Sequence, residues 1–219
     1  MNQAQLKKLD TLFENEIAHC RITDAAIQIE HKGSVCFTSF YGGAQKNSIY
    51  KIYSMTKPIT ATALMMLYEN GAFDLDDPVS KFLPSFGQMK VVVPAGADTS
   101  CAKGLEVTKR GTLVRDAQTV MTIRHLLNMT SGMVYPGDNT PAEKEVIDAQ
   151  AELRDRVEKG ESLSNIDVCV RLGQCPLEFD PGTNWKYGTS ADIIGGLVEI
   201  ISGMQFGEFL RQHLFEPLG

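Results

Sequence analysis

Hydrophobic and polar positions switch between a helical and a strand period along the first third of the chain. Apolar residues recur every three or four positions across 6–17, which predicts an amphipathic first helix. The segments AAIQIE (25–30) and SVCFTSFYGG (34–43) flank a polar HKG turn and predict a β-hairpin. Residues 54–70 are rich in apolar side chains and end before Gly71, so we expect a buried helix there.

Helical patterns return after an irregular middle segment. Residues 87–120 contain only short strand-like pieces, and residues 121–133 (MTIRHLLNMTSGM) predict a helix closed by a turn. The charged pattern of residues 141–160 predicts an exposed helix, and the pair Asp77-Pro78 is typical of a helix start. Three further helices are expected within 163–179, 190–203 and 206–219.

Composition and charge narrow the class of protein. The 219 residues allow one large domain or two small ones, and 43% hydrophobic with 22% charged residues is ordinary for a globular chain. A net charge of −6 without a long basic run argues against nucleic acid and anionic membrane as partners. With no apolar run of membrane-spanning length and no signal peptide at the start, we expect a cytoplasmic protein, although a chain whose leader had been removed would look the same. The five cysteines, an odd number without a CxxC pair, are expected to be reduced and mostly buried.

Ser54 and Lys57 stand together at the start of the 54–70 helix. Pro58 favours an irregular first turn of 3₁₀ type, in which residues three apart nearly eclipse one another. A serine hydroxyl becomes a nucleophile when a neighbouring base takes its proton. Lys57 could be that base if burial and the positive end of the helix lowered its pKa by ~3 from the reference value. The alternative is a plain helix cap, because a lone S-x-x-K arises often by chance.

The surroundings of this pair resemble a known family. The segment IYSMTKPITATALMMLYENGAFDLDDPVSKFLPSF (52–86) is similar to the nucleophile region of the serine β-lactamase-like superfamily. This superfamily comprises class C β-lactamases, D-alanyl-D-alanine carboxypeptidases and family VIII-type esterases. The resemblance continues in MTIRHLLNMTSGM, in PLEFDPGTNWKYGTSADIIGGLVEIISG (176–203) and in FLRQHLFEPLG (209–219). Four blocks in family order make the signal specific.

The resemblance implies an α+β fold, the β-lactamase-like fold, with an antiparallel sheet flanked by helices plus a mainly helical region. It divides the chain into 1–75, the first part of the α/β region with the nucleophile helix; 76–190, the helical region with its irregular insert; and 191–219, the return helices. The family's third motif, K-T-G or a variant such as W-G-G or H-x-G, does not occur after FEPLG. We therefore expect the C-terminal strands to come from a missing C-terminal segment or a second chain.

The resemblance also assigns roles to residues of the YGTS segment. It implies that Tyr187 opens the second motif and shares a proton with Lys57, so that either group could deprotonate Ser54. Thr189 takes the slot where lactamases and peptidases usually have an asparagine that binds the substrate's amide carbonyl. Thr189 is thus a candidate substrate-binding residue, and its departure from asparagine favours the esterase-like branch.

The sequence therefore predicts a serine hydrolase that works through a Ser54 acyl-enzyme on a small ester or amide, most simply an esterase. Two alternatives stay open: a true β-lactamase or D-Ala-D-Ala carboxypeptidase, and a non-catalytic binding or scaffolding member of the fold. No cofactor is expected, and the four histidines lack metal-ligand spacing, so no metal is expected either. Association into a homo-oligomer also stays open.

Overall fold

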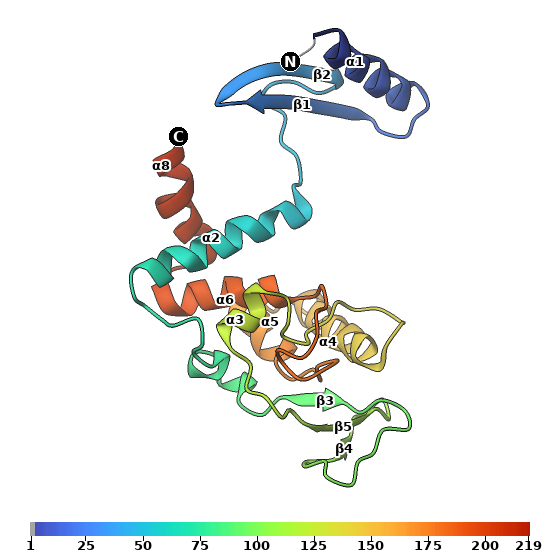
Figure 1. Cartoon of the computed structure of the whole chain (residues 1–219), viewed down its shortest axis with the longest axis vertical. Coiled ribbons are helices and arrows are strands. Elements are labelled where there is room, and N and C mark those ends of the chain that lie inside the picture. Colours follow the sequence, from blue (N-terminus) through green and yellow to red (C-terminus); the bar gives the residue numbers. More distant parts are fainter. Residues whose placement is uncertain (1–2) are drawn as a thin grey trace. The chain divides into compact units, whose positions relative to one another are not determined.

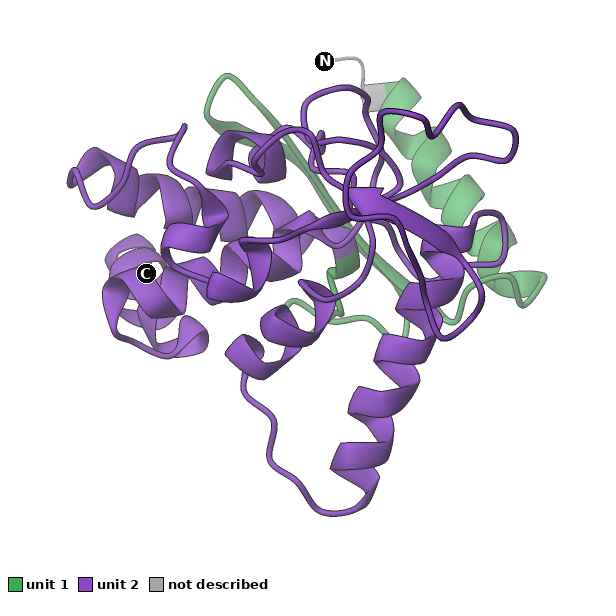
Figure 2. Cartoon of the chain, turned by 90° about the horizontal axis from the view of Figure 1, so that it is seen from below, with its two compact units in different colours: residues 1–53 green, residues 54–219 purple. Residues whose placement is uncertain are grey.

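The computed structural model describes residues 3–219 and divides the chain into two compact units, 1–53 and 54–219 (Figure 2). Both units mix helices with small antiparallel sheets, in agreement with the predicted α+β class. The division by compactness groups residues differently from the three regions expected from the sequence, which remain a prediction.

The first unit is a helix packed on a hairpin (Figure 1). It consists of α1 (Gln3–Ala18), β1 (Asp24–His31) and β2 (Ser34–Gly42). The two strands pair antiparallel around Lys32 and Gly33, whose positive φ values of 52° and 75° suit the tight turns that match strand twist. The predicted first helix and hairpin are confirmed.

The helix α1 is fixed to this hairpin by an aromatic stack and by two hydrogen bonds to Asp10, from Ser39 and from Tyr41. The rings of Phe13 and Tyr41 stack with centroids 4.9 Å apart. The Tyr41 hydroxyl also donates to Asp10 Oδ1 at 2.7 Å, which satisfies the polar end of a buried ring.

The second unit carries the remaining elements. Its small sheet has the antiparallel order β3-β5-β4, and its helices gather around one apolar core. The elements are η1 (Tyr53–Met55, which begins at the last residue of the first unit), α2 (Thr56–Glu69), η2 (Val79–Lys81), η3 (Pro84–Phe86), β3 (Lys90–Val92), β4 (Glu106–Val107), β5 (Leu113–Asp116), α3 (Ile123–Leu127), α4 (Pro141–Glu158), α5 (Asn165–Leu172), α6 (Ser190–Ser202), α7 (Phe206–Leu210), η4 (Arg211–Phe215) and α8 (Glu216–Leu218).

The helices α2 and α6 lie side by side in the core of the second unit (Figure 1). Ala63 and Leu64 on α2 and Ile193 and Leu197 on α6 are fully buried. Burial of each large aliphatic side chain stabilises the fold by roughly 1.5–3 kcal/mol. This packing fixes the axis of α2, and with it the position of the turn that carries Ser54.

Two sequence expectations about helices were wrong. The helix expected after Asp77-Pro78 is only the short 3₁₀ turn η2. The backbone there pairs with another segment instead: Val79 N–H donates to the Met121 carbonyl, and Asp77 accepts from Ile123 N–H. The helix α4 is not exposed all round, because one face carries the buried residues Ala142, Glu143, Val146, Ala149 and Leu153.

The cysteines are also less buried than expected. Only Cys169 and Cys175 are buried, whereas Cys20 and Cys101 are exposed and Cys36 is half-buried. Burial raises the pKa of the Cys169 thiol to about 12 and that of Cys175 to about 11, so both thiols stay protonated at neutral pH.

Within residues 3–219 no single helix is long and apolar enough to cross a membrane. One helix pair, Ser190–Ser202 with Phe206–Leu218, meets the length and composition together but is bent by 79°.

Candidate active site

The turn before α2 brings Ser54 and Lys57 together. It is a 3₁₀ turn, as Pro58 predicted, and Lys57 Nζ donates to Ser54 Oγ at 3.3 Å. The preceding residue, Tyr53, has φ of 47°, a left-handed conformation that costs a residue with a Cβ roughly 1–3 kcal/mol. Strained backbone of this kind concentrates at functional sites, where the structure around it holds a reactive side chain in place.

Two tyrosine rings flank the Lys57 ammonium. Nζ lies 4.9 Å from the ring centroid of Tyr187 and 5.5 Å from that of Tyr135. The two rings touch, with centroids 5.7 Å apart and planes inclined by 53°. The predicted Ser54–Lys57 pair and Tyr187, which the family resemblance indicated, therefore lie in one cluster.

Tyr135 is a member of this cluster that the sequence analysis missed. Its only signal was its place directly after the TSGMV stretch of a family-like block. It is half-buried, and the Lys57 ammonium lies over its ring.

The pKa of Lys57 is shifted upward, opposite to the expectation from the sequence. Partial burial lowers the Lys57 pKa, but hydrogen bonds with the phenols of Tyr135 and Tyr187 outweigh that effect and raise it. Lys57 is therefore an ammonium ion at neutral pH, and the prediction of a neutral lysine with a lowered pKa was wrong.

The pKa of Tyr187 moves in the opposite direction. Hydrogen bonds with the Ser54 hydroxyl and the Lys57 ammonium lower it below the ordinary value of a phenol. A phenol with a lowered pKa that contacts the serine hydroxyl can accept its proton. The directions of these two pKa shifts thus favour Tyr187 as the base and Lys57 as the cation that stabilises the phenolate.

Backbone pairing between two distant segments puts the two tyrosines together. The first segment, residues 129–132, accepts three backbone hydrogen bonds from the second, residues 178–186. They run from Lys186 N–H to Met129 O at 3.0 Å, from Gly182 N–H to Thr130 O at 2.8 Å and from Glu178 N–H to Gly132 O at 2.9 Å. The approach is so close that a Cβ at Gly188 would lie 2.1 Å from the Met133 carbonyl oxygen. Glycine is required there because no side chain fits.

His125, on α3, stabilises the start of the helix that leads into residues 129–132. Its Nδ1 accepts the Thr122 backbone N–H at 3.2 Å, which caps the helix start. Burial lowers the pKa of this imidazole, so the neutral form that can accept this bond is favoured. His125 thus has a structural role at the start of α3.

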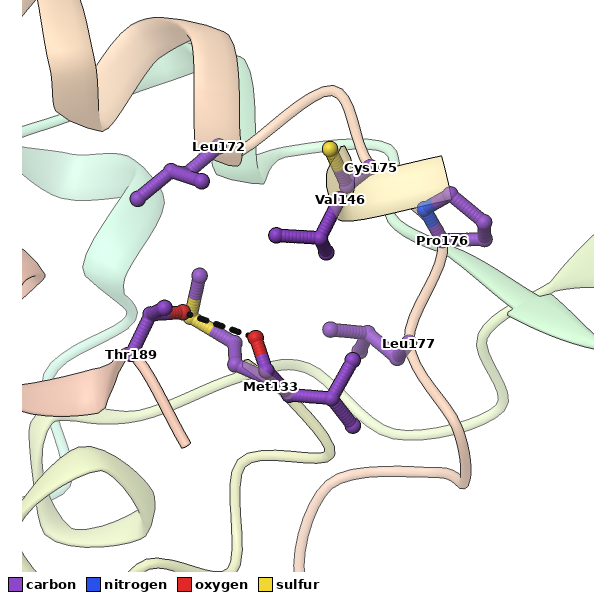
Figure 3. A pocket seen from close by; sticks show the side chains of 8 residues that line it. Met133, Val146, Leu172, Cys175, Pro176, Leu177 and Thr189 are labelled. Atoms are coloured by element: carbon purple, nitrogen blue, oxygen red, sulfur yellow. Dashed lines mark hydrogen bonds between the residues drawn. The ribbon is translucent and has the colours of Figure 1, made fainter. Parts of the chain in front are cut away.

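Thr189 lies beside the cluster in sequence but inside the protein in space. Its side chain is 3% exposed and lines a small cavity with Met133, Leu172 and Leu177 (Figure 3). Its hydroxyl donates to the Val134 carbonyl oxygen at 3.4 Å. This geometry favours a structural role, and substrate binding by Thr189 stays a prediction.

Replacing Thr189 separates these two roles. Thr189→Val keeps the shape and removes only a long hydrogen bond, so we expect ester turnover to stay within about twofold and stability to fall by about 1 kcal/mol. Steady-state kinetics and a urea melt measure the two effects. A rise in KM of tenfold or more at unchanged stability would assign the hydroxyl to the substrate instead.

An ion pair between the half-buried Arg115 and the buried Asp180 anchors the segment that leads to Tyr187. Arg115 Nη2 lies 2.5 Å from Asp180 Oδ2, and Asp180 Oδ1 accepts the Gln118 backbone N–H at 2.7 Å. The Arg115 guanidinium, and next the Gln118 N–H, lower the pKa of the Asp180 carboxyl despite its burial. The pair thus fixes the turn that precedes Tyr187.

Removing this carboxylate should destabilise the protein in a pH-dependent way. Asp180→Asn removes the carboxylate partner of Arg115 and leaves the Asp116 carbonyl oxygen as its acceptor. We expect about 3 kcal/mol lower free energy of unfolding at pH 7, the low end for a broken buried pair. Because the folded pKa is lowered, this stability is fully present above the unfolded value of about 3.9 and is lost as the pH falls from there through the folded pKa. The difference between urea melts of the two proteins should therefore shrink as the pH is lowered below about 4. A constant difference between them at all pH values would contradict the assigned cause.

The sequence of this chain matches the model of a known protein family. The Beta-lactamase family model matches residues 9–219. The chain belongs to the Beta-lactamase family. Among residues 3–219 of this family member, no group of three or more His, Cys, Asp and Glu side chains is arranged to hold a metal ion.

Relatives of this family member include transferases and an esterase. Acyltransferase calJ of Penicillium decumbens is 31% identical over 80% of this chain and 37% of its own length. Esterase EstB of Burkholderia gladioli is 26% identical over 97% of this chain and 49% of its own. The unliganded simvastatin synthase (LovD) from Aspergillus terreus, as the selenomethionyl derivative, superimposes with a TM-score of 0.68 at 26% identity, over 98% of this chain and 51% of that one.

These matches confirm the β-lactamase-like fold predicted from the sequence. The chain spans between 37% and 51% of the length of these relatives.

Proposed function

We propose that this protein is a serine hydrolase that cleaves esters through an acyl-enzyme on Ser54. The observation that carries the proposal is the cluster itself, in which Lys57 Nζ lies 3.3 Å from Ser54 Oγ and beneath the rings of Tyr135 and Tyr187. A plain helix cap needs neither a cation nor two phenols.

In the first half of the proposed reaction, the Tyr187 phenolate accepts the Ser54 hydroxyl proton while Oγ attacks the ester carbonyl carbon. Lys57 stays protonated and stabilises the Tyr187 phenolate before it accepts this proton and again after it has given the proton up. The C–O bond of the ester breaks as Tyr187 returns the proton to the departing alcohol. The acyl group is then held by Ser54 Oγ.

In the second half, water takes the place of the alcohol. Tyr187 removes a proton from the water as it attacks the acyl carbon, and the proton passes to Ser54 Oγ as the acid leaves. The start of α2 can offer the Ser54 backbone N–H to the oxyanion in both halves. Tyr135 supports the cycle by holding the ammonium of Lys57 under both rings.

An ester substrate is favoured over a peptide or β-lactam for a specific reason. The slot that usually carries an amide-binding asparagine holds Thr189, whose hydroxyl is engaged with the Val134 carbonyl. The resemblance to Esterase EstB agrees with this choice.

Acyl transfer is the second candidate function. It differs from hydrolysis only in the final acceptor, which is an alcohol instead of water. The observation that favours it is that two of the relatives carry the names acyltransferase and simvastatin synthase.

A substrate panel tests these options together. p-Nitrophenyl acetate and butyrate, a chromogenic cephalosporin and a D-Ala-D-Ala peptide are compared, each with and without a primary alcohol as acceptor. We expect the esters to be turned over fastest, and an ester product with the alcohol would favour transfer. Faster cephalosporin hydrolysis would replace the proposal by a β-lactamase. A permanent adduct without turnover would leave only a binding role.

A further inference from the structure

Glu143, in the first turn of α4, is a buried carboxylate that the proposed reaction does not use. Its side chain is 9% exposed, and Lys186 Nζ lies 3.1 Å from Glu143 Oε1. Burying a carboxylate costs free energy unless it is paired and hydrogen-bonded, so the contacts of Glu143 indicate its role. These contacts reach both segments that carry the tyrosines.

One carboxylate oxygen of Glu143 holds the loop that follows Tyr135. Glu143 Oε2 accepts the Asn139 backbone N–H at 3.0 Å. The same loop passes the carboxylate so closely that a Cβ at Gly137 would lie 2.6 Å from Oε2. Because Tyr135 lies only two residues before Gly137, this contact constrains the backbone next to Tyr135.

The other oxygen holds the segment that carries Tyr187, through Lys186. Lys186 directly precedes Tyr187, and its backbone N–H donates to Met129 O at 3.0 Å. Its ammonium also contacts Glu178 Oε1 at 3.2 Å, so the cation keeps one partner if Glu143 is neutralised. This second partner makes a clean substitution of Glu143 feasible.

We propose that Glu143 is a positioning residue whose carboxylate ties the Tyr135 loop to the Tyr187 segment, so that both phenols stay beside Lys57. The inference rests on the proposed function, because it concerns the same proton-transfer group. Glu143 acts through Asn139 and Lys186 and does not touch the reacting atoms.

The direction of change in the Tyr187 pKa distinguishes positioning from simple electrostatics. Removing a negative charge near a phenol stabilises the phenolate, so a purely electrostatic role predicts a lower Tyr187 pKa in Glu143→Gln. Loss of positioning instead weakens the hydrogen bonds from Ser54 and Lys57 that hold this pKa down, and predicts a higher one. The other titratable groups of the cluster, Tyr135 beside the ring and Asp192, whose carboxyl interacts with the Lys57 charge, are not substituted in this variant.

A second variant changes no charge at all. In Gly137→Ala the new methyl group displaces the Glu143 carboxylate, so any rise in the Tyr187 pKa must come from position. Gly207→Ala is the matched control, because a Cβ at this exposed glycine of α7 meets nothing within 4 Å.

The test is a spectroscopic titration of the phenol at 295 nm, taken as the difference between each protein and its own Tyr187→Phe derivative. Thermal melts first establish that each variant unfolds cooperatively. We expect the Tyr187 pKa to rise towards its ordinary value in Glu143→Gln and in Gly137→Ala, and to stay unchanged in Gly207→Ala. Labelling of Ser54 by a fluorophosphonate at pH 7 should slow by about tenfold in the first two, because misplacement of this size is costly.

A lowered or unchanged Tyr187 pKa in both variants would overturn the positioning role. The titration needs no substrate, so it is independent of turnover. Failure of the parent protein to react with the probe or with esters would count against the proposed function, whereas the titration would still decide the role of Glu143.

Discussion

Ser54→Ala is expected to abolish covalent labelling by a fluorophosphonate and to lower ester hydrolysis by about 10⁴-fold or more, as for other serine nucleophiles. The reason is that Ser54 Oγ is the atom that the acyl group would join, and alanine offers no replacement. Because Ser54 is exposed at the start of α2, its hydroxyl can be removed without disturbing the core.

Intact-mass spectrometry measures the labelling directly. The parent protein should gain the mass of one probe, and Ser54→Ala should gain none. Ser34→Ala is a matched control, because Ser34 is also an exposed serine and lies at the start of β2. An adduct that persists in Ser54→Ala would remove Ser54 from its role.

Lys57→Met and Tyr187→Phe are each expected to lower ester hydrolysis by about 10²-fold or more, with much less than additive loss in the double variant. The two side chains act on one proton, so removing either disables the same step. The double variant should therefore resemble the worse single variant, and a double-mutant cycle on kcat/KM measures the coupling.

The pH dependence gives these two variants different signatures. In the parent protein, activity should rise as the pH rises through the lowered pKa of Tyr187, because the phenolate is the active form. Lys57→Met removes one of the two groups that lower this pKa, so the rise should move to higher pH. Tyr187→Phe should lose this rise. Two results together would rule out a shared proton. The losses in kcat/KM of the two single variants would multiply in the double variant, and the pH profile of activity in Lys57→Met would be unshifted.

The start of α2 could be predicted from the sequence because its determinants are local. Pro58 dictates an irregular first turn, and an S-x-x-K spacing in such a turn brings Ser54 and Lys57 together. The structure has this turn, with the predicted pair in hydrogen-bond contact. The helix α2 follows from a run of apolar residues in the same way.

Tyr135 and the direction of the Lys57 pKa could not be predicted, because both depend on contacts between distant segments. The sequence indicates that Lys57 is near a helix start and partly buried, which alone would lower its pKa. It does not indicate that the segment with Tyr135 folds back on the segment with Tyr187 and places two phenols against the ammonium.

Glu143 and Thr189 illustrate the same limit for burial. A charged helix pattern predicts an exposed face, but Glu143 lies on the side of α4 that faces the core. There it forms an ion pair with Lys186 from another segment. Thr189 lies in a functional motif, yet the turn into α6 points its hydroxyl at the Val134 carbonyl. Neither partner is close in sequence.

The most direct test of the central claim is to trap the acyl group itself. The protein is mixed with p-nitrophenyl butyrate, quenched in acid within milliseconds and digested, and the modified peptide is sequenced by mass spectrometry. The account predicts a butyryl group on Ser54, formed with a burst of p-nitrophenol and more slowly in Tyr187→Phe. Turnover of the ester with no acyl group on Ser54, or with the group on another residue, would contradict it.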